Sequence, residues 1–406
     1  MKRIMIYILC SVLVLSGMTG CDRKQEVSGS GVETTSELNI ETTEEPEKGV
    51  TGNQQEPTEA PAVITIADIT SEELVADMKI GWNLGNTLDS VGGIALESER
   101  AWGNPVTTQE MIDEVLAQGF NVIRIPVTWE GHFGDGPDYL IHDIWMNRVQ
   151  EVVDYAYDKG AYVILNLHHE DWHFPSEENK EEASVMITAL WTQIAERFKD
   201  YDEHLIFEGL NEPRKKGTAY EWNGGDKEGR DVVNHFMQVF VDAVRATGGN
   251  NTYRHLMVCG YAASSSTDAL KSIKLPEDDK LIVSVHAYVP YNFALNTTGT
   301  SVFEATNEID KLMSDIRQIF VEQGVPVIIG EFGAMNKENE EERVEWATYY
   351  VSKAREIGVP CIWWDNNAFA GSGENFGLFN RREMNWPYPD LLKALQDAAG
   401  VVPLSK

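Results

Sequence analysis

An apolar run that ends in a charged side chain occurs at Val325-Pro326-Val327-Ile328-Ile329-Gly330-Glu331. Nearly continuous apolar runs of this length are typical of parallel strands that are buried on both faces. Similar runs recur along the chain, and most of them have polar or aromatic residues at or just after their ends. The predicted strands are Met78–Leu84, Asn121–Val127, Ala161–Leu167, His204–Glu208, Arg254–Cys259, Leu281–His286, Val325–Glu331 and Cys361–Asp365.

Segments with helical periodicity separate most of these runs. The predicted helices are Thr107–Gln118, Ile144–Lys159, Ala183–Lys199, Arg230–Thr247, Glu304–Gln323, Glu341–Ile357 and Asp390–Ala399, and several are closed by a glycine: Gly119, Gly160, Gly248, Gly324 and Gly358. The alternation predicts a single (β/α)8 TIM barrel over residues 66–406, an α/β fold of suitable length. An open doubly wound sheet is the alternative, but no glycine-rich phosphate-binding turn follows the first strand.

The N-terminus has the layout of a secretory signal peptide over residues 1–20. Lys2 and Arg3 precede an apolar run from Ile4 to Leu15, which is shorter than a membrane span. The following Met18-Thr19-Gly20-Cys21 resembles a bacterial lipoprotein signal, in which Cys21 becomes the lipidated first residue. We therefore expect a secreted protein that is lipid-anchored to the outer face of a bacterial cell membrane, with ordinary signal cleavage as the alternative.

Residues 21–65 form a low-complexity linker that is rich in acidic residues and Thr. No aromatic residue occurs from Asp22 to Ala62, so the segment cannot bury enough apolar area to offset its chain entropy. We expect this linker to be disordered. The predicted catalytic domain follows directly, without a separate binding module.

The composition limits the classes of ligand. The 406 residues include 33 Lys and Arg against 65 Asp and Glu, which gives a formal net charge of −32 and argues against nucleic acid as a partner. The chain also has 11 Trp, 14 Tyr and 14 Phe. An acidic, aromatic-rich protein suits a neutral, partly apolar ligand such as a sugar.

Polar and aromatic residues gather where the predicted strands end, which is the face that carries the active site in barrels of this kind. Two glutamates, Glu212 and Glu331, follow strands on opposite sides of this rim. Hydrolysis of a glycosidic bond needs such a pair, one as acid and one as nucleophile or base. The other candidate site residues, which we expect to bind substrate, are Asn83, Arg124, His168, His169, Asn211, His286, Tyr288 and Trp364.

Several motifs resemble glycoside hydrolase family 5. They are Ile206-Phe207-Glu208-Gly209-Leu210-Asn211-Glu212-Pro213, Ile329-Gly330-Glu331-Phe332-Gly333 and Gly81-Trp82-Asn83-Leu84-Gly85-Asn86, and the resemblance covers about Ser71 to Leu395. Three more, Gly103-Asn104-Pro105, Asn166-Leu167-His168-His169 and Trp363-Trp364-Asp365-Asn366, are similar to the endoglucanases of its subfamily four. That branch includes cellulases, lichenases and xyloglucanases.

The resemblance implies a retaining endo-β-1,4-glucanase that acts as a monomer on cellulose, mixed-linkage glucan or xyloglucan without a cofactor. Glu212 would be the general acid/base and Glu331 the nucleophile, with the charge of Glu331 raising the pKa of Glu212. Asn211 would hydrogen-bond the sugar 2-hydroxyl, and Arg124 and Tyr288 would hold Glu331. His168 and His286 would line the −1 subsite, and Trp364 would form the floor under the reacting ring. His169 would bind sugar or support His168.

Several alternatives stay open at this point. An endo-β-mannanase or xylanase, or an inactive sugar-binding lipoprotein, would show the same overall pattern. The segment from His168 to His173 contains metal-ligand types, but it lacks helical zinc spacing, and adjacent His168 and His169 should point to opposite sides. We therefore expect no metal. Cys259 and Cys361 are interpreted as buried hydrophobes, and Trp102, Trp129, Trp172, Trp222 and Trp363 as either core or cleft residues.

Overall fold

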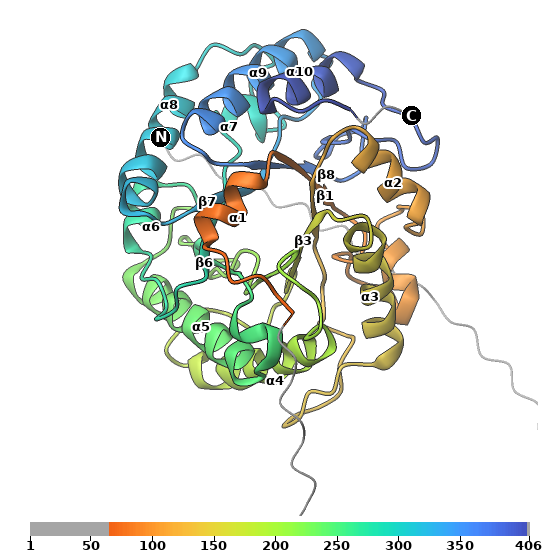
Figure 1. Ribbon diagram of the computed structural model, residues 1–406. Coiled ribbons are helices and arrows are strands. Elements are labelled where there is room, and N and C mark those ends of the chain that lie inside the picture. The colour runs from red at the N-terminus through yellow and green to blue at the C-terminus, as the bar shows by residue number, and fades with distance from the viewer. Residues whose placement is uncertain (1–64, 404–406) are drawn as a thin grey trace, which may run out of the picture. The chain divides into compact units, whose positions relative to one another are not determined.

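Eight parallel strands close into a barrel in the computed structural model, which describes residues 65–403 (Figure 1). Each strand pairs in parallel with the next, and β8 pairs with β1. The predicted (β/α)8 fold is confirmed. The strands are β1 (Ile80–Leu84), β2 (Val122–Ile125), β3 (Tyr162–Asn166), β4 (Leu205–Glu208), β5 (Leu256–Ser264), β6 (Leu281–His286), β7 (Val327–Phe332) and β8 (Cys361–Asp365).

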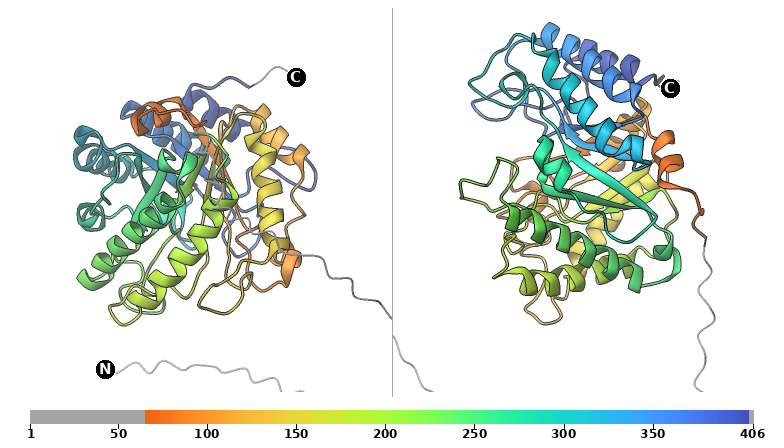
Figure 2. Two further views of the ribbon diagram at one scale, coloured as in Figure 1. Left: turned by 60° about the horizontal axis from the view of Figure 1, so that its bottom comes forward. Right: turned by 90° about the vertical axis from the view of Figure 1, so that its left-hand side faces the viewer.

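The larger helices surround the strands on the outside, as the views in Figure 2 also show. The α-helices are α1 (Ser71–Asp77), α2 (Gln109–Ala117), α3 (Asp143–Tyr157), α4 (Lys180–Arg197), α5 (Lys227–Ala246), α6 (Thr267–Ser272), α7 (Tyr291–Ala294), α8 (Thr306–Ile319), α9 (Glu340–Glu356) and α10 (Pro389–Ala399). Three short 3-10 helices, η1 (Ala95–Arg100), η2 (Gly249–Thr252) and η3 (Val321–Gln323), lie in connections.

The predicted strands and long helices are present with boundaries that differ by a few residues. The largest difference is at β5, which continues to Ser264, five residues beyond the predicted end. The predicted glycines after the helices all have positive φ, from 68° at Gly248 to 90° at Gly119. The short helices α1, α6 and α7 were not predicted, because segments of seven residues or fewer show too little apolar periodicity.

The lower part of the barrel interior is filled by apolar side chains. Alternate residues of the strands point inward there, and α1 closes the end of the barrel (Figure 1). Leu74 and Val75 of α1 and Met78, which follows the helix, belong to the same cluster. A capping box between Thr70 and Glu73 fixes the start of α1. The strand residues of this layer are Val122, Tyr162, Ile164, Ile206, Met257, Ile282, Ile328 and Ile362.

Only glycine fits where β1 contributes to this layer. A Cβ atom at Gly81 would lie 2.8 Å from Cγ2 of Ile362 and 3.0 Å from Cβ of Val122, closer than side-chain atoms approach one another. The missing side chain therefore allows β1 to pack against its two neighbours.

The main core lies between the strands and the surrounding helices. It contains Trp82, Trp129, Trp191 and Trp363, all with no exposed surface, so two of the five ambiguous tryptophans are core residues. The two cysteines of this region are free and buried. Burial raises the pKa of each thiol, which confirms their interpretation as small buried hydrophobes.

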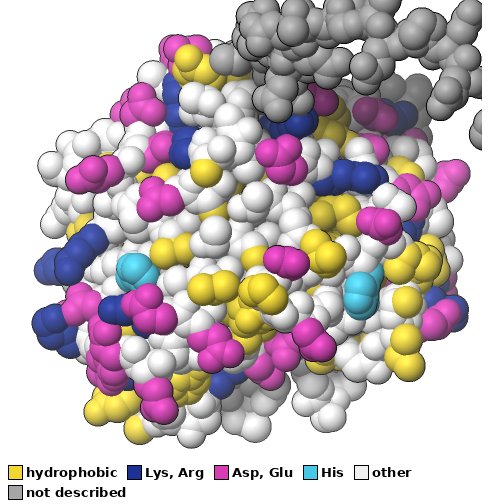
Figure 3. All heavy atoms as spheres, turned by 90° about the horizontal axis from the view of Figure 1, so that it is seen from below, with side chains coloured by type: hydrophobic (Ala, Val, Ile, Leu, Met, Phe, Trp, Pro, Cys, Tyr) yellow, Lys and Arg dark blue, Asp and Glu magenta, His cyan; other side chains and the backbone are white. Residues whose placement is uncertain are grey.

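The signal peptide, Cys21 and the linker up to residue 64 lie outside the described residues. Within residues 65–403, no helix is both long and apolar enough to cross a membrane. The face of the molecule shown in Figure 3 carries Asp and Glu side chains among Lys, Arg and apolar residues, without a continuous basic patch.

Candidate active site

A buried arginine connects the polar residues at the upper end of the barrel. Arg124 on β2 donates from Nε to Oε2 of Glu208 (2.7 Å) and from Nη2 to Oδ1 of Asn211 (2.7 Å). Its Nη1 donates to Oε1 of Glu331 (2.9 Å) and to Oδ1 of Asn83 (2.9 Å). Burial lowers the pKa of Arg124, but the two carboxylates more than offset this effect and raise it. Arg124 therefore stays charged and holds residues from β1, β4 and β7 in one network.

Glu331 at the end of β7 accepts two hydrogen bonds that fix its carboxylate. One comes from Arg124, and the other comes from the hydroxyl of Tyr288 to Oε2 (2.8 Å). Burial, followed by the charge of Glu331, raises the pKa of Tyr288 well above its ordinary value. The phenol therefore keeps the proton that it donates to Glu331.

Glu212 lies across from Glu331 on the connection that follows β4. Its Oε1 is 2.9 Å from Nδ1 of His286, and the same nitrogen is 3.6 Å from Oε1 of Glu331. Carboxylate oxygens of the two glutamates lie within 4.8 Å of each other. Arg214 contacts Oε2 of Glu212 from the other side at 3.5 Å.

The protonation of Glu212 differs from the prediction. We predicted that the charge of Glu331 raises its pKa, and burial, the largest influence, does act in this direction. However, the hydrogen bond and charge of His286, followed by Arg214 and His169, lower the pKa of Glu212 below its ordinary value. Burial lowers the pKa of His286, but Glu331 and Glu212 outweigh it and raise that pKa. These opposite shifts favour an ion pair between His286 and Glu212.

His168, His169 and Trp364 lie together on another part of the rim. The rings of His168 and Trp364 are parallel, with centroids 5.7 Å apart. Burial is the main cause that lowers the pKa of His168 well below its ordinary value and that of His169 to about 4, so both imidazoles are neutral. Their ring centroids are 4.4 Å apart, which makes the prediction of opposite directions wrong. The reason is that β3 ends at Asn166, so strand alternation no longer applies to these two residues.

Comparison with known proteins identifies the family. The chain matches the cellulase family, glycosyl hydrolase family 5, over residues 85–370. The chain belongs to glycoside hydrolase family 5. It is similar to Endoglucanase B of Neocallimastix patriciarum, with 52% identity over 343 residues, which make up 82% of this chain and 72% of that protein. It is 50% identical to Endoglucanase A of Ruminococcus albus over 329 residues, 79% of this chain and 90% of the relative.

Solved structures of family 5 enzymes resemble the chain over the same region. A subfamily four broad-specificity endoglucanase from Ruminococcus champanellensis with bound cellotriose superposes with a TM-score of 0.80 at 50% identity, covering 82% of this chain and 99% of that one. A xyloglucan-specific endo-β-1,4-glucanase from a metagenomic library, in complex with cellotriose, superposes with a TM-score of 0.78 at 44% identity. The match covers 80% of this chain and 98% of that one. The predicted family and its subfamily four resemblance are thus confirmed.

The structure brings all ten predicted site residues of this family 5 chain to the upper end of the barrel, where Arg124 and Asn83 are completely buried. The side chain of Asn83 is held by protein atoms. Its amide Nδ2 donates to the carbonyl groups of Gly330, Ile362 and Trp363, while its Oδ1 accepts from Arg124. These contacts indicate a role in positioning Arg124. They give no support to the predicted contact with substrate.

Sequence reasoning assigned no role to Glu208 or Asn166. Glu208 is completely buried and accepts from Arg124, from Nδ2 of Asn166 (3.0 Å) and from the hydroxyl of Ser284 (2.7 Å). Asn166 also lies 3.1 Å from Nδ1 of His168. Glu208 could have been found from the sequence, because it is an acidic residue at an inward position of an otherwise apolar strand. A buried carboxylate in such a position requires a partner of opposite charge.

The ambiguous tryptophans that are not in the core lie on rim connections. Trp102 is 43% exposed, with its ring 5.5 Å from that of His169. Trp222 is 64% exposed and lies over the guanidinium of Arg214 at 4.1 Å. Trp172 is half-buried and donates to Glu170. Two exposed aromatic faces thus flank the polar centre.

Two groups near the centre contain atoms suitable for binding a metal. Asp89, His168 and His169 form one, and Glu212, His286 and Glu331 form the other, each with ligand atoms within 4.8 Å. Both oxygens of Asp89 already accept backbone N–H groups, from Asn86 (3.0 Å) and Thr87 (2.6 Å). The expectation of a metal-free site stays a prediction.

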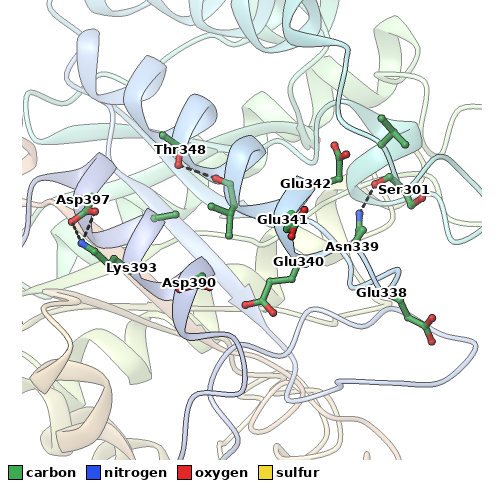
Figure 4. Close-up of a pocket in the computed structure, with 13 residues that line it drawn as sticks. Ser301, Glu338, Asn339, Glu340, Glu341, Glu342, Thr348, Asp390, Lys393 and Asp397 are labelled. Atoms are coloured by element: carbon green, nitrogen blue, oxygen red, sulfur yellow. Dashed lines mark hydrogen bonds and ion pairs between the residues drawn. The ribbon is translucent and has the colours of Figure 1, made fainter.

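A large open cavity lies away from this centre. It has a volume of about 1100 Å³ and lies between α9, α10 and the connection at Ser301 (Figure 4). Acidic side chains such as Glu338, Glu340 and Asp390 line it, but none of the predicted site residues does. Because Arg124 and Tyr288 orient Glu331 on the rim and His286 contacts Glu212 there, the rim is the better candidate active site.

Proposed function

We propose that the protein hydrolyses internal β-1,4 bonds of β-glucans with retention of configuration, using Glu331 as the nucleophile and Glu212 as the acid/base. The observation that carries this proposal is the separation of the two carboxylates, whose oxygens approach within 4.8 Å. Retaining glycosidases hold their carboxyl groups about 5–5.5 Å apart, whereas inverting enzymes leave roughly 6.5–9.5 Å for a water molecule.

The environments of the two glutamates support this division of roles. Glu331 accepts hydrogen bonds from Arg124 and Tyr288 through its two oxygens, so it is held as an oriented carboxylate. It attacks the anomeric carbon while Glu212 protonates the departing glycosidic oxygen. Glu212 then removes a proton from the water that hydrolyses the glycosyl-enzyme. Two inversions at the anomeric carbon give a product of the original β configuration.

His286 supplies the proton that the first step requires. Its Nδ1 is 2.9 Å from Oε1 of Glu212, so a proton held by the imidazole reaches the carboxylate along an existing hydrogen bond. The total number of protons in the site does not change during this transfer. A site with neutral His286 and protonated Glu212 is therefore available to a bound substrate even though the pKa of Glu212 is lowered.

Asn211 and Trp364 are placed to bind the sugar at the reacting position. Oδ1 of Asn211 accepts from Arg124, which leaves its Nδ2 to donate to a sugar hydroxyl. Trp364 offers an aromatic ring beside His168 and near Tyr288. Aromatic faces suit the apolar faces of pyranose rings.

The relatives support a β-glucan as the substrate class. They comprise endoglucanases, a lichenase in complex with cellotetraose and a xyloglucan-specific enzyme in complex with cellotriose. We propose broad use of unbranched and branched β-1,4-glucans, because Trp102 and Trp222 provide exposed aromatic surfaces that do not depend on one linkage pattern.

A substrate panel with product analysis tests the proposal. Purified protein should release oligosaccharides from carboxymethyl cellulose, mixed-linkage glucan and xyloglucan, and proton NMR should first detect the β-anomer. Mannan and xylan serve as controls. Faster hydrolysis of mannan or xylan would replace the substrate assignment, an α-anomer as first product would exclude the retaining mechanism, and no release of reducing ends would indicate a sugar-binding protein without catalysis.

We also propose that the mature protein is a monomer anchored by lipid on Cys21 to the outer face of a bacterial cell membrane. Support comes from the apolar run that precedes Met18-Thr19-Gly20-Cys21. Cys21→Ala should release the protein from the membrane fraction without changing its specific activity. A wild-type protein that is already soluble and begins at another residue would contradict the anchor, and light scattering of the released form would test the monomer.

A further inference from the structure

The phenol of Tyr288 reaches Glu331 from the connection that follows β6, two residues beyond the end of the strand. The backbone before it is fixed, because Ala287 donates its N–H to the carbonyl of Glu331 (2.9 Å) and accepts from the hydroxyl of Tyr350 (2.8 Å). The hydroxyl of Tyr288 lies at the far end of its side chain. Its hydrogen bond to Glu331 (2.8 Å) therefore depends also on what packs against the ring.

Phe376, on the connection between β8 and α10, packs against this ring. The two ring centroids are 5.3 Å apart, and the ring planes are inclined by 49°. Phe376 forms a small buried cluster with Met335 and Trp364, and Tyr288 packs against the same cluster. Because Phe376 has no exposed surface, it contacts the hydrogen-bond donor of Glu331 without being accessible to a substrate.

A glycine just after β7 makes room for this packing. A Cβ atom at Gly333 would lie 3.0 Å from Cδ1 of Phe376 and 3.8 Å from Cε1 of Tyr288. The first distance is shorter than ordinary contacts between side chains, and the second is an ordinary van der Waals contact. A side chain at this position would therefore displace Phe376 and would press on Tyr288 only through it.

The backbone of Phe376 is anchored to the end of β8. Its N–H donates to Oδ1 of Asn366 (3.2 Å), and its carbonyl accepts from Nε1 of Trp363 (3.0 Å). The amide of Asn366 also donates from Nδ2 to the carbonyl of Glu374 (2.7 Å), two residues before Phe376. These bonds hold the Phe376 ring in place independently of Tyr288, so the ring is a fixed support for the phenol.

We propose that Phe376 is a positioning residue, which keeps the ring of Tyr288 in the orientation that directs its hydroxyl at Glu331. The inference rests on the proposed function, because this orientation affects turnover only if Glu331 is the nucleophile. Loss of the Phe376 ring leaves space into which the phenol turns, and a small rotation moves the distant hydroxyl furthest. A misplacement of about 1 Å in a catalytic group can lower a rate by roughly 10²-fold.

A double-mutant cycle tests whether Phe376 acts through the hydroxyl of Tyr288. Phe376→Ala is measured in the wild-type and in the Tyr288→Phe background, by kcat on carboxymethyl cellulose and by kcat/KM on an aryl β-cellobioside. In the wild-type background both values should fall roughly 10- to 100-fold, because Glu331 attacks both substrates. In the Tyr288→Phe background the same change should cost less than about threefold, since no hydroxyl remains to be positioned.

Two further variants allow for the chance that Phe376→Ala does not fold. Phe376→Leu keeps most of the buried volume but not the ring, and Gly333→Ala leaves the ring present but displaced. Both should lower kcat less than Phe376→Ala does, and both effects should again disappear in the Tyr288→Phe background. Circular dichroism and denaturant titration establish that each variant is folded under the conditions of the assay.

Phe379→Leu is the matched control. Phe379 lies on the same connection and is also completely buried, but its ring packs against Trp386, with centroids 4.9 Å apart. This variant should be less stable than wild type and should keep kcat within about twofold, because burial of its ring contributes to the fold alone.

The proposal and the proposed function fail in different ways. Equal losses for Phe376→Ala, Phe376→Leu or Gly333→Ala in the two backgrounds would overturn the proposal and assign Phe376 to packing alone. Tyr288→Phe with unchanged kcat would also overturn it, because the hydroxyl would then not contribute to turnover. Wild-type protein that hydrolyses neither substrate would overturn the proposed function, and this inference with it.

Discussion

The barrel interior has two levels that differ completely in chemistry although the same strands build both. On β4, Ile206 lies in the apolar lower layer, and Glu208, two residues further along, is hydrogen-bonded to Arg124 in the upper one. On β6 the corresponding residues are Ile282 and Ser284. The lower layer contains side chains that need no specific partner. Each side chain of the upper layer depends on a particular atom from another strand.

The comparison shows how the fold separates stability from chemistry. Apolar packing tolerates small changes of shape because dispersion and burial have no preferred direction. A buried ionic network requires its full set of partners, since removing one member leaves an uncompensated charge. Changes at the lower level should therefore affect the free energy of unfolding, and changes at the upper level should affect turnover.

The largest effect is expected from Glu331→Ala at the upper level. Without the nucleophile no glycosyl-enzyme can form, so kcat should fall on every substrate by on the order of 10⁶-fold, as it does when other covalent nucleophiles are removed. Steady-state rates on carboxymethyl cellulose and on an aryl β-cellobioside measure this loss. Circular dichroism should show an intact fold, and measurable residual turnover on the aryl substrate would assign the nucleophile elsewhere.

Glu212→Ala should have a smaller effect that depends on the substrate. Loss of general acid catalysis should lower the rate on glucans by roughly 10²–10⁴-fold but spare the first step for an activated aryl leaving group. Azide should accelerate this variant and give a β-glycosyl adduct, which NMR can identify. An α-adduct, or the same behaviour for Glu331→Ala, would reverse the two assignments.

The two levels can be compared directly on β4. Ile206→Ala should lower the free energy of unfolding by about 2–5 kcal/mol and leave kcat within twofold of wild type. Glu208→Gln, at the next inward position, should lower kcat by about 10²-fold because Arg124 loses a partner and Glu331 shifts. Denaturant titration and initial rates measure both quantities. If Ile206→Ala reduced kcat as strongly as Glu208→Gln does, the separation of the two levels would be wrong.

His286→Gln should change the pH profile. The pKa of His286 is raised in the folded protein, so the proton needed by Glu212 is present below this pKa and is lost as pH rises through it. In the variant the proton must reside on a carboxyl group, whose ordinary pKa of 4.5 lies below the 6.5 of imidazole. The alkaline limb of kcat/KM should move to lower pH. An unmoved limb would exclude His286 as the proton source.

The smallest effect should follow removal of metal ions. The chemistry proposed for the upper level uses only Glu212, Glu331 and their hydrogen-bond partners, so dialysis against a chelator should leave kcat unchanged. Atomic emission analysis of the dialysed protein provides the control. Loss of activity that zinc restores would show that one of the two groups, Asp89–His168–His169 or Glu212–His286–Glu331, binds a functional ion.

The sequence by itself determined the barrel, its order of elements and the two glutamates, because apolar runs, helix-ending glycines and strand-end motifs are local signals. Only the tertiary structure revealed that Asn83 positions Arg124, that the rings of His168 and His169 are in edge contact and that Glu208 belongs to the site. It also reversed the expected shift in the pKa of Glu212, since His286 comes from a strand 74 residues further along the chain. The direction of a side chain, its burial and its charge partners all depend on residues that are distant in the sequence. The order of residues along the chain does not give the distances between them in space.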